Sequence, residues 1–217
     1  EGAETTIIDA TGTTRNALLI AAPGVTVDGF TFINWGQVGD TGGNNNRRAV
    51  VAGEIVDTIR EKLIITNGED TNEIKILNNI IIYNDEQDRQ ANGIVSEKNV
   101  GPVLIQGNRV EGVTYTREGV DEEIWRGTGI AVWGAQNVII NENTVQDTQL
   151  SIGLYGFQTI ETKDIMISNN TIENSGNAHI HVNHEYGAGM DESNISITGN
   201  TLGMTQVYYL EGINRPD

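Results

Sequence analysis

The three histidines of the chain, His179, His181 and His184, fall within one short segment, AHIHVNHEYGAGMDE. Side chains two residues apart on a strand point to the same side, so His179 and His181 are predicted to lie together. Imidazole binds metals and exchanges protons near neutral pH, and Glu185 or Asp191 would supply a third metal ligand. Ordinary surface histidines explain the same spacing, and we therefore assign no metal site from the sequence.

Aromatic side chains form the second group that could bind a ligand. The register of four similar strands predicts an outward stack of Glu97, Trp133, Tyr155 and Asn183, which are our candidate ligand-binding residues. Neighbouring aromatic rings suit the apolar face of a sugar, whose hydroxyls would bond to the amide and the carboxylate. Two alternatives stay open: the rings pack on each other as a secondary core beneath an inserted loop, or they anchor another protein chain.

An internal repeat sets the positions of these residues. Six segments align without gaps, and they begin at Val25, Ile74, Val103, Val138, Ile165 and Ile195. Their first, third and eighth positions are apolar throughout, and the spacing of the first two is the two-residue period of a strand with one buried face. A second series of strands precedes them at residues 92–97, 128–133, 151–156 and 178–183, with 17–22 and 207–212 extending it.

A sharp bend is predicted at the fifth position of each segment, which is Gly or Asn in all but one case. These two residue types accept left-handed backbone angles. The next position is Asn79, Asn108, Asn143, Asn170 or Asn200 in five segments and Phe30 in the first. We expect the asparagines to stack as a ladder of side-chain amides, with Phe30 breaking it at the first rung.

These patterns predict a single all-β domain over residues 1–217, a right-handed parallel β-helix (a solenoid) of about six to seven coils. The repeated aliphatic and asparagine positions resemble the pectate-lyase-like superfamily, specifically its parallel β-helix repeat proteins, over residues 5–211. Two insertions, at about residues 34–73 and 113–127, interrupt the repeat. In the first, Ile55, Ile59 and Leu63 are spaced for a short helix.

The resemblance also implies an alternative function, a lyase or epimerase acting on acidic polysaccharide. His181 would then work with Tyr209 or Tyr186 as acid and base, while Arg126 or Arg117 neutralised a uronate carboxylate. The sequence departs from such enzymes because its outward strand positions offer no Asp cluster. We assign no catalytic residue firmly, and calcium in the acidic loops 84–87 and 119–123 is the one cofactor left open.

Charge and composition narrow the choice of partners. The net charge is −17, from 13 Lys and Arg against 30 Asp and Glu, which excludes a general nucleic-acid binder. There is no cysteine, and no apolar run approaches the roughly 18 residues of a membrane span. A chain that starts at Glu1 fits a mature protein after signal-peptide removal, so we expect it outside the cell or at the cell surface.

The ends of the predicted coil lead to the functional expectation. The predicted coil begins with the segment AETTIIDATG and ends with VYYLEGINRPD. Both segments resemble strands rather than capping helices. Uncovered strand edges pair readily with other chains. We therefore expect a structural or adhesive protein that stacks head to tail on itself in a surface layer, filament or fibre. A polysaccharide contact at Trp133 and Tyr155 is an additional option.

Overall fold

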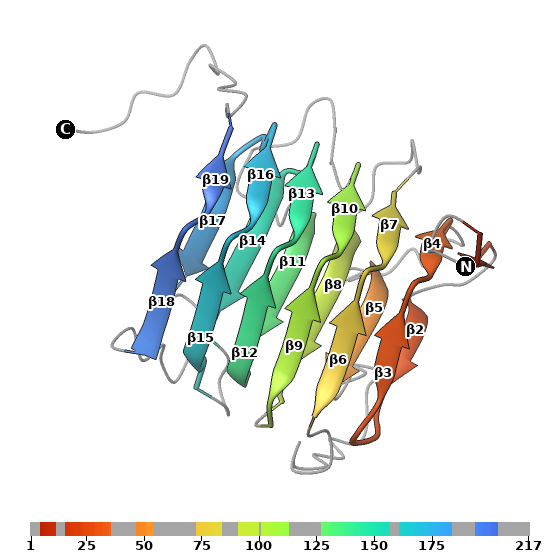
Figure 1. Cartoon of the computed structure of the whole chain (residues 1–217), viewed down its shortest axis with the longest axis horizontal. Helices are drawn as coiled ribbons and strands as arrows, with labels where there is room; N and C mark the ends of the chain where they lie inside the picture. Colours follow the sequence, from red (N-terminus) through yellow and green to blue (C-terminus); the bar gives the residue numbers. More distant parts are fainter. Residues whose placement is uncertain are drawn as a thin grey trace, which may run out of the picture.

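The computed structural model describes residues 5–11, 16–35, 47–53, 73–83, 91–99, 101–112, 127–156, 161–183 and 194–203. The regular elements in these ranges are all strands, and they form three sheets (Figure 1). Every pairing between the strands is parallel. No helix in these ranges is long and apolar enough to cross a membrane.

The three sheets are named here A, B and C. Sheet A contains β1 (Ile7–Asp9), β4 (Thr31–Ile33), β7 (Ile80–Ile82), β10 (Arg109–Glu111), β13 (Thr144–Gln146), β16 (Thr171–Glu173) and β19 (Thr201–Leu202). Sheet B contains β2 (Asn16–Ile20), β5 (Arg47–Gly53), β8 (Ala91–Glu97), β11 (Thr128–Trp133), β14 (Leu150–Tyr155) and β17 (Ala178–Asn183). Sheet C contains β3 (Thr26–Asp28), β6 (Ile74–Leu77), β9 (Val103–Gln106), β12 (Gln136–Asn141), β15 (Lys163–Ser168) and β18 (Ile195–Thr198).

Consecutive strands belong to different sheets, and each strand pairs with the third strand after it. We call three consecutive strands, one from each of sheets B, C and A, a rung. The first complete rung is β2, β3 and β4, and the last is β17, β18 and β19. Each new rung therefore lies on the previous one at the strand spacing of about 4.8 Å. This all-β stack of parallel sheets confirms the predicted class and is compatible with a β-solenoid.

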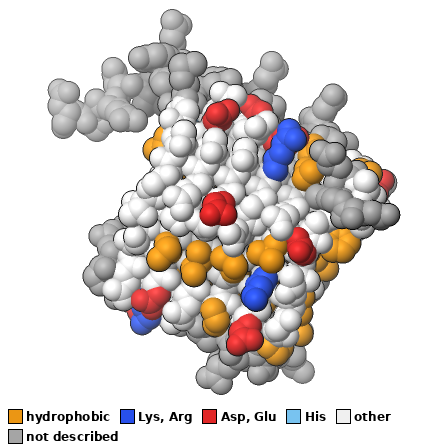
Figure 2. All heavy atoms as spheres, viewed as in Figure 1, with side chains coloured by type: hydrophobic (Ala, Val, Ile, Leu, Met, Phe, Trp, Pro, Cys, Tyr) orange, Lys and Arg blue, Asp and Glu red, His pale blue; other side chains and the backbone are white. Residues whose placement is uncertain are grey.

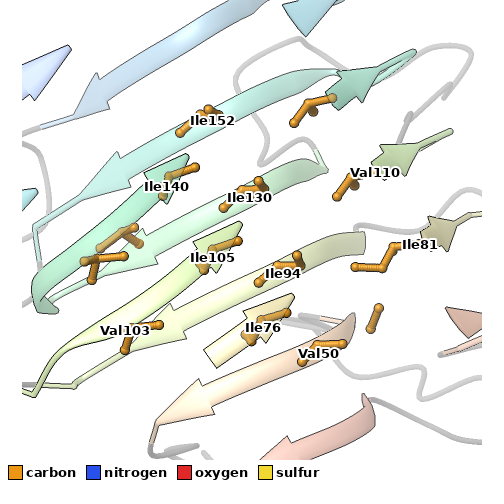
Figure 3. Packing of buried hydrophobic residues seen from close by; sticks show 14 of the residues in the cluster. Val50, Ile76, Ile81, Ile94, Val103, Ile105, Val110, Ile130, Ile140 and Ile152 are labelled. Carbon is orange, nitrogen blue, oxygen red and sulfur yellow. The ribbon is translucent and has the colours of Figure 1, made fainter. Parts of the chain in front are cut away.

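The core lies between the sheets and consists of the predicted apolar columns. In sheet C, Ile76, Ile105, Ile140 and Ile167 follow one another in register and are fully buried. Figure 3 shows side chains of this kind from sheets A, B and C pointing toward one another. Full burial of one such side chain contributes about 1.5–3 kcal/mol, so the repeated columns supply the main stabilisation of the stack.

The bends and the asparagine ladder are also as predicted. The bend residues have left-handed backbone angles, for example φ 72° at Gly29, 51° at Asn78 and 55° at Glu142. Asn108 Oδ1 accepts hydrogen bonds from the backbone N and Nδ2 of Asn79 at 2.9 and 3.0 Å. The same pair of bonds recurs from rung to rung as far as Asn200. The ladder ends at Phe30, whose backbone N donates to Asn79 Oδ1 at 3.0 Å.

The first predicted insertion, residues 34–73, contains a regular strand. This strand, β5, pairs with β2 and β8, and Val50 lies between Leu18 and Ile94 in the buried column of sheet B. The interruption at 34–73 is therefore divided by a rung strand that the sequence analysis missed. The helix expected at residues 55–63, and residues 113–126 of the second insertion, lie outside the described residues.

Candidate functional site

The predicted outward stack lies in register across sheet B. Trp133 pairs with Glu97 on one side and with Tyr155 on the other, and Tyr155 pairs in turn with Asn183. The rings of Trp133 and Tyr155 are 5.5 Å apart and nearly perpendicular, at 75°. Their edge-to-face geometry is a favourable one for aromatic pairs. The adjacency of these residues is therefore confirmed, whereas their role in binding stays a prediction.

The expected solvent exposure of this stack is wrong for two of its members. Tyr155 is 8% exposed and Glu97 is 4% exposed. Tyr155 forms a small cluster, separate from the main core, with Val95 and Ala131, and Trp133 packs against this cluster while only partly buried. The side chain of Asn183 lies outside what the structure describes. The stack thus resembles the secondary core that the sequence left open as an alternative.

A glycine explains why Tyr155 is buried. A Cβ atom at Gly153 would lie 2.5 Å from Tyr155 Cε2, so the ring lies against the bare backbone of its own strand. The Tyr155 hydroxyl then reaches Thr128 Oγ1 at 3.1 Å. Any side chain at position 153 would displace the ring. In this position the tyrosine closes the outer surface of sheet B and leaves Trp133 as the more accessible ring.

The two histidines of β17 contact different groups. His181 lies beside Tyr155, with ring centroids 5.9 Å apart. His179 Nδ1 is 2.7 Å from Ser175 Oγ, and its Nε2 is 2.8 Å from the carbonyl oxygen of Gly203. Within the described residues, no group of three His, Asp or Glu side chains is placed to hold a metal ion. The general-base role proposed for His181 stays a prediction.

His179 ends a chain of hydroxyl groups that the sequence analysis missed. Thr148 Oγ1 lies 2.8 Å from Ser151 Oγ, which in turn contacts Ser175 Oγ. Because the carbonyl of Gly203 can only accept, Nε2 of the neutral His179 ring carries the hydrogen, and Nδ1 accepts from Ser175. The two serines are fully buried, so this chain holds the last rung in place rather than exposing a nucleophile. Thr148 follows Asn143 at the same spacing as Ser175 follows Asn170. This repeated hydroxyl position is visible in the sequence.

Several candidate residues cannot be placed. Tyr186, Tyr209 and Arg126, the proposed partners of His181, lie outside the described residues. The acidic loops 84–87 and 119–123, where calcium was left open, lie outside them as well. The acid–base arrangement and the calcium site are therefore untested predictions.

The outer face of sheet C bears a row of hydrophobic side chains (Figure 2). Leu104, Ile139 and Met166 occupy neighbouring strands in register, and Ile139 is 40% exposed. Lys75 continues the same row on β6. The row lies on the side of the stack, on strands whose edges are already paired on both sides.

The two ends of the stack are covered to different degrees. At the first rung Ile20, Val27 and Phe32 are at most 5% exposed, while the interior residues Leu18 and Val25 are partly buried. The last residues of the same three columns are Val182, Ile197 and Leu202, which are 36, 45 and 53% exposed. Among the described residues, no strand pairs with the outer edges of β17, β18 and β19. The strand predicted at 207–212 lies outside the described residues. Within the part of the chain that the structure describes, these three columns therefore end in exposed side chains.

The last rung is also uncharged. Residues 178–183 and 194–203 contain no Asp, Glu, Lys or Arg, although the whole chain has a net charge of −17. The corresponding sheet C and sheet A segments of the earlier rungs all carry charge, for example Asp28, Lys75, Arg109, Glu142 and Lys163. Charged side chains on an edge strand normally discourage pairing with other chains. The last rung combines exposed apolar side chains, unpaired strand edges and no fixed charge, so its geometry suits association.

Comparison of the chain with models of protein families, with curated proteins and with solved structures found no match.

Proposed function

We propose that this protein is a structural or adhesive β-solenoid that acts outside the cell or at its surface and associates with itself through the end of its strand stack. The proposal includes the finer fold assignment, a right-handed parallel β-helix of the pectate-lyase-like superfamily. The parallel sheets, the left-handed bend positions and the asparagine ladder support that assignment.

The exposed, uncharged last rung is the observation on which the functional proposal depends. Ile197 and Leu202 remain in contact with water, whereas Ile167 and Ile172, the residues before them in the same columns, are fully buried and gain the stabilisation of that burial. A second copy of the chain would cover these side chains and pair the free strand edges at the same time. The −17 charge of each copy opposes close approach at low salt, so association is expected to strengthen as salt screens that repulsion.

The lateral surface offers weaker support for a glycan contact. A sugar could reach the partly buried Trp133, whereas Tyr155 turns its ring toward Gly153. Polysaccharide binding is therefore a subsidiary part of the proposal. Lyase or epimerase activity stays a prediction from the resemblance, since no contact of the described residues favours it.

The proposal is tested by sedimentation velocity over a wide range of protein concentration and salt. We expect concentration-dependent association at high salt, and Ile197→Lys should abolish it by placing a charge on the last rung. Ile139→Lys is the matched control, because Ile139 is exposed to a similar degree but lies on the side of the stack. A wild-type protein that stays monomeric at every concentration and salt would overturn the proposal.

A further inference from the structure

We propose that two copies join last rung to last rung about a two-fold axis. In this arrangement β17 of one copy runs antiparallel to β17 of the other, and the two copies of His181 lie opposite each other. The inference rests on the proposed self-association and identifies its partner surface. Such an isologous contact closes on itself as a dimer, whereas the head-to-tail contact expected from the sequence would grow without limit.

The shapes of the two edges favour this arrangement. Sheet A contains seven strands among the described residues, and sheets B and C contain six each. The additional strand is β1, which extends one strand beyond β2 and β3, so the N-terminal edge is stepped. At the C-terminal edge of the described strands, β17, β18 and β19 belong to one rung and end together. A flush edge matches a second flush edge in all three sheets, but it matches a stepped edge in only one.

The chemistry of the two edges points the same way. The N-terminal edge carries Asp9 and Asp28, and the Asp9 carboxylate accepts hydrogen bonds from the backbone N and Oγ1 of Thr11 and from Asn34 Nδ2. These bonds, of which that from the Thr11 hydroxyl has the largest effect, lower the pKa of Asp9 and keep it charged. Covering carboxylates with an uncharged apolar edge would remove their water without supplying a partner. Two last rungs bring no such charges together.

The register follows from strand length and side-chain direction. A two-fold axis pairs one of the three edge strands with its own copy, and β17, with six residues, is longer than β18 with four or β19 with two. Ile180 and Val182 occupy interior columns and must stay on the interior side across the joint. Ile180 opposite its own copy and Ile180 opposite Val182 of the other copy both meet this condition. The second register sets each exposed Val182 against an isoleucine rather than against Ala178, so we adopt it, and it leaves His181 opposite itself. Opposed residues in an antiparallel pair have Cβ atoms about 4.5–5.5 Å apart.

Cysteine cross-linking tests this register directly, because the chain contains no cysteine of its own. His181→Cys should form a disulfide-linked dimer under mild oxidation, since opposed positions fall within the Cα separation that a disulfide spans. Lys75→Cys, at an exposed position on β6 far from the C-terminal edge, is the control and should stay uncross-linked. Association without a cross-link at position 181, or growth into longer species, would overturn the two-fold joint but leave self-association intact. A strictly monomeric protein would refute both.

Discussion

The two ends of the stack are built from the same repeat but treat their interior columns differently. At the N-terminal end large aromatic residues close the core: Phe32 and Trp35 are fully buried, and the Trp35 ring lies 5.2 Å from that of Tyr83. At the C-terminal end of the described residues, Ile197 and Leu202 are ordinary repeat residues, and both are exposed. The repeat therefore specifies the rungs but does not by itself specify an end. An end is closed only where the sequence departs from the repeat, as it does at Phe30.

The largest difference between an interior rung and the last rung is expected in the ladder. Asn143→Ala should destabilise the fold by about 4 kcal/mol, because Asn143 is buried, donates to the Ile105 and Asn170 oxygens and accepts from Asn108. Asn200→Ala should cost less, about 2 kcal/mol, since Asn200 lies at the accessible end but accepts the bonds of the buried Asn170 backbone N and Nδ2. Urea unfolding monitored by circular dichroism measures both values. Equal losses would mean that the end rung is as tightly held as the interior.

A second matched pair lies within one apolar column of sheet C. Ile140→Ala should destabilise the protein by about 3 kcal/mol, because it leaves a cavity in a fully buried position. Ile197→Ala in the same column should change the stability of the monomer by less than about 1 kcal/mol, since that side chain is already in contact with water. The same unfolding experiment at low protein concentration compares them. A large loss for Ile197→Ala in the monomer would show that its column is covered.

The aromatic cluster on sheet B predicts a smaller effect. Gly153→Ala places a methyl group where the Tyr155 ring lies, so the ring must leave its position and lose the contact with Thr128. We expect a destabilisation of about 1–2 kcal/mol and a loss of near-ultraviolet circular dichroism from the Trp133–Tyr155 pair. An unchanged aromatic signal would mean that the Tyr155 ring is already turned toward solvent. That result would support the prediction that the stack is exposed and binds a sugar.

The smallest expected effect concerns Asp9 at the N-terminal edge. Its pKa is lowered from the usual value of 3.8, first by the Thr11 hydroxyl and then by Asn34. A lowered pKa means that the carboxylate adds to stability above that usual value and that this contribution is lost as the pH falls through the lowered pKa. Thr11→Ala should move the Asp9 titration, followed by NMR, back toward 3.8. No movement would show that the hydroxyl does not hold the carboxylate in solution.

Much of the fold follows from the sequence because the determining interactions repeat. The columns that include Ile76 and Ile140, and the ladder at Asn108 and Asn143, occur at one position in every segment and identify themselves by alignment. Strand β5 was not predicted because its apolar residues are consecutive and follow two arginines and a Gly/Asn-rich stretch. A single irregular segment lacks the support that the alignment gives to the others.

The candidate site was less predictable because it depends on contacts that do not repeat. The register that places Trp133 beside Tyr155 followed from the strand pattern, and it is confirmed. The burial of Tyr155 depends on the absence of a side chain at Gly153, which occurs in one strand only. The bond from His179 on β17 reaches the backbone carbonyl of Gly203, the residue after β19. Every residue has such a carbonyl, so the sequence does not reveal this contact.

The uniform hydrogen bonding of the ladder has a consequence for how the length of this protein can change. Asn143 and Asn170 are 27 residues apart and make the same bonds to their neighbours, so the intervening stretch is a self-contained unit. A second copy of that stretch, inserted in frame, would make the same contacts with the rungs on both sides of it. Deletion of the stretch would bring together two rungs that can make those contacts with each other. Gene rearrangement could thus lengthen or shorten the protein in whole units while leaving the properties of its two termini unchanged.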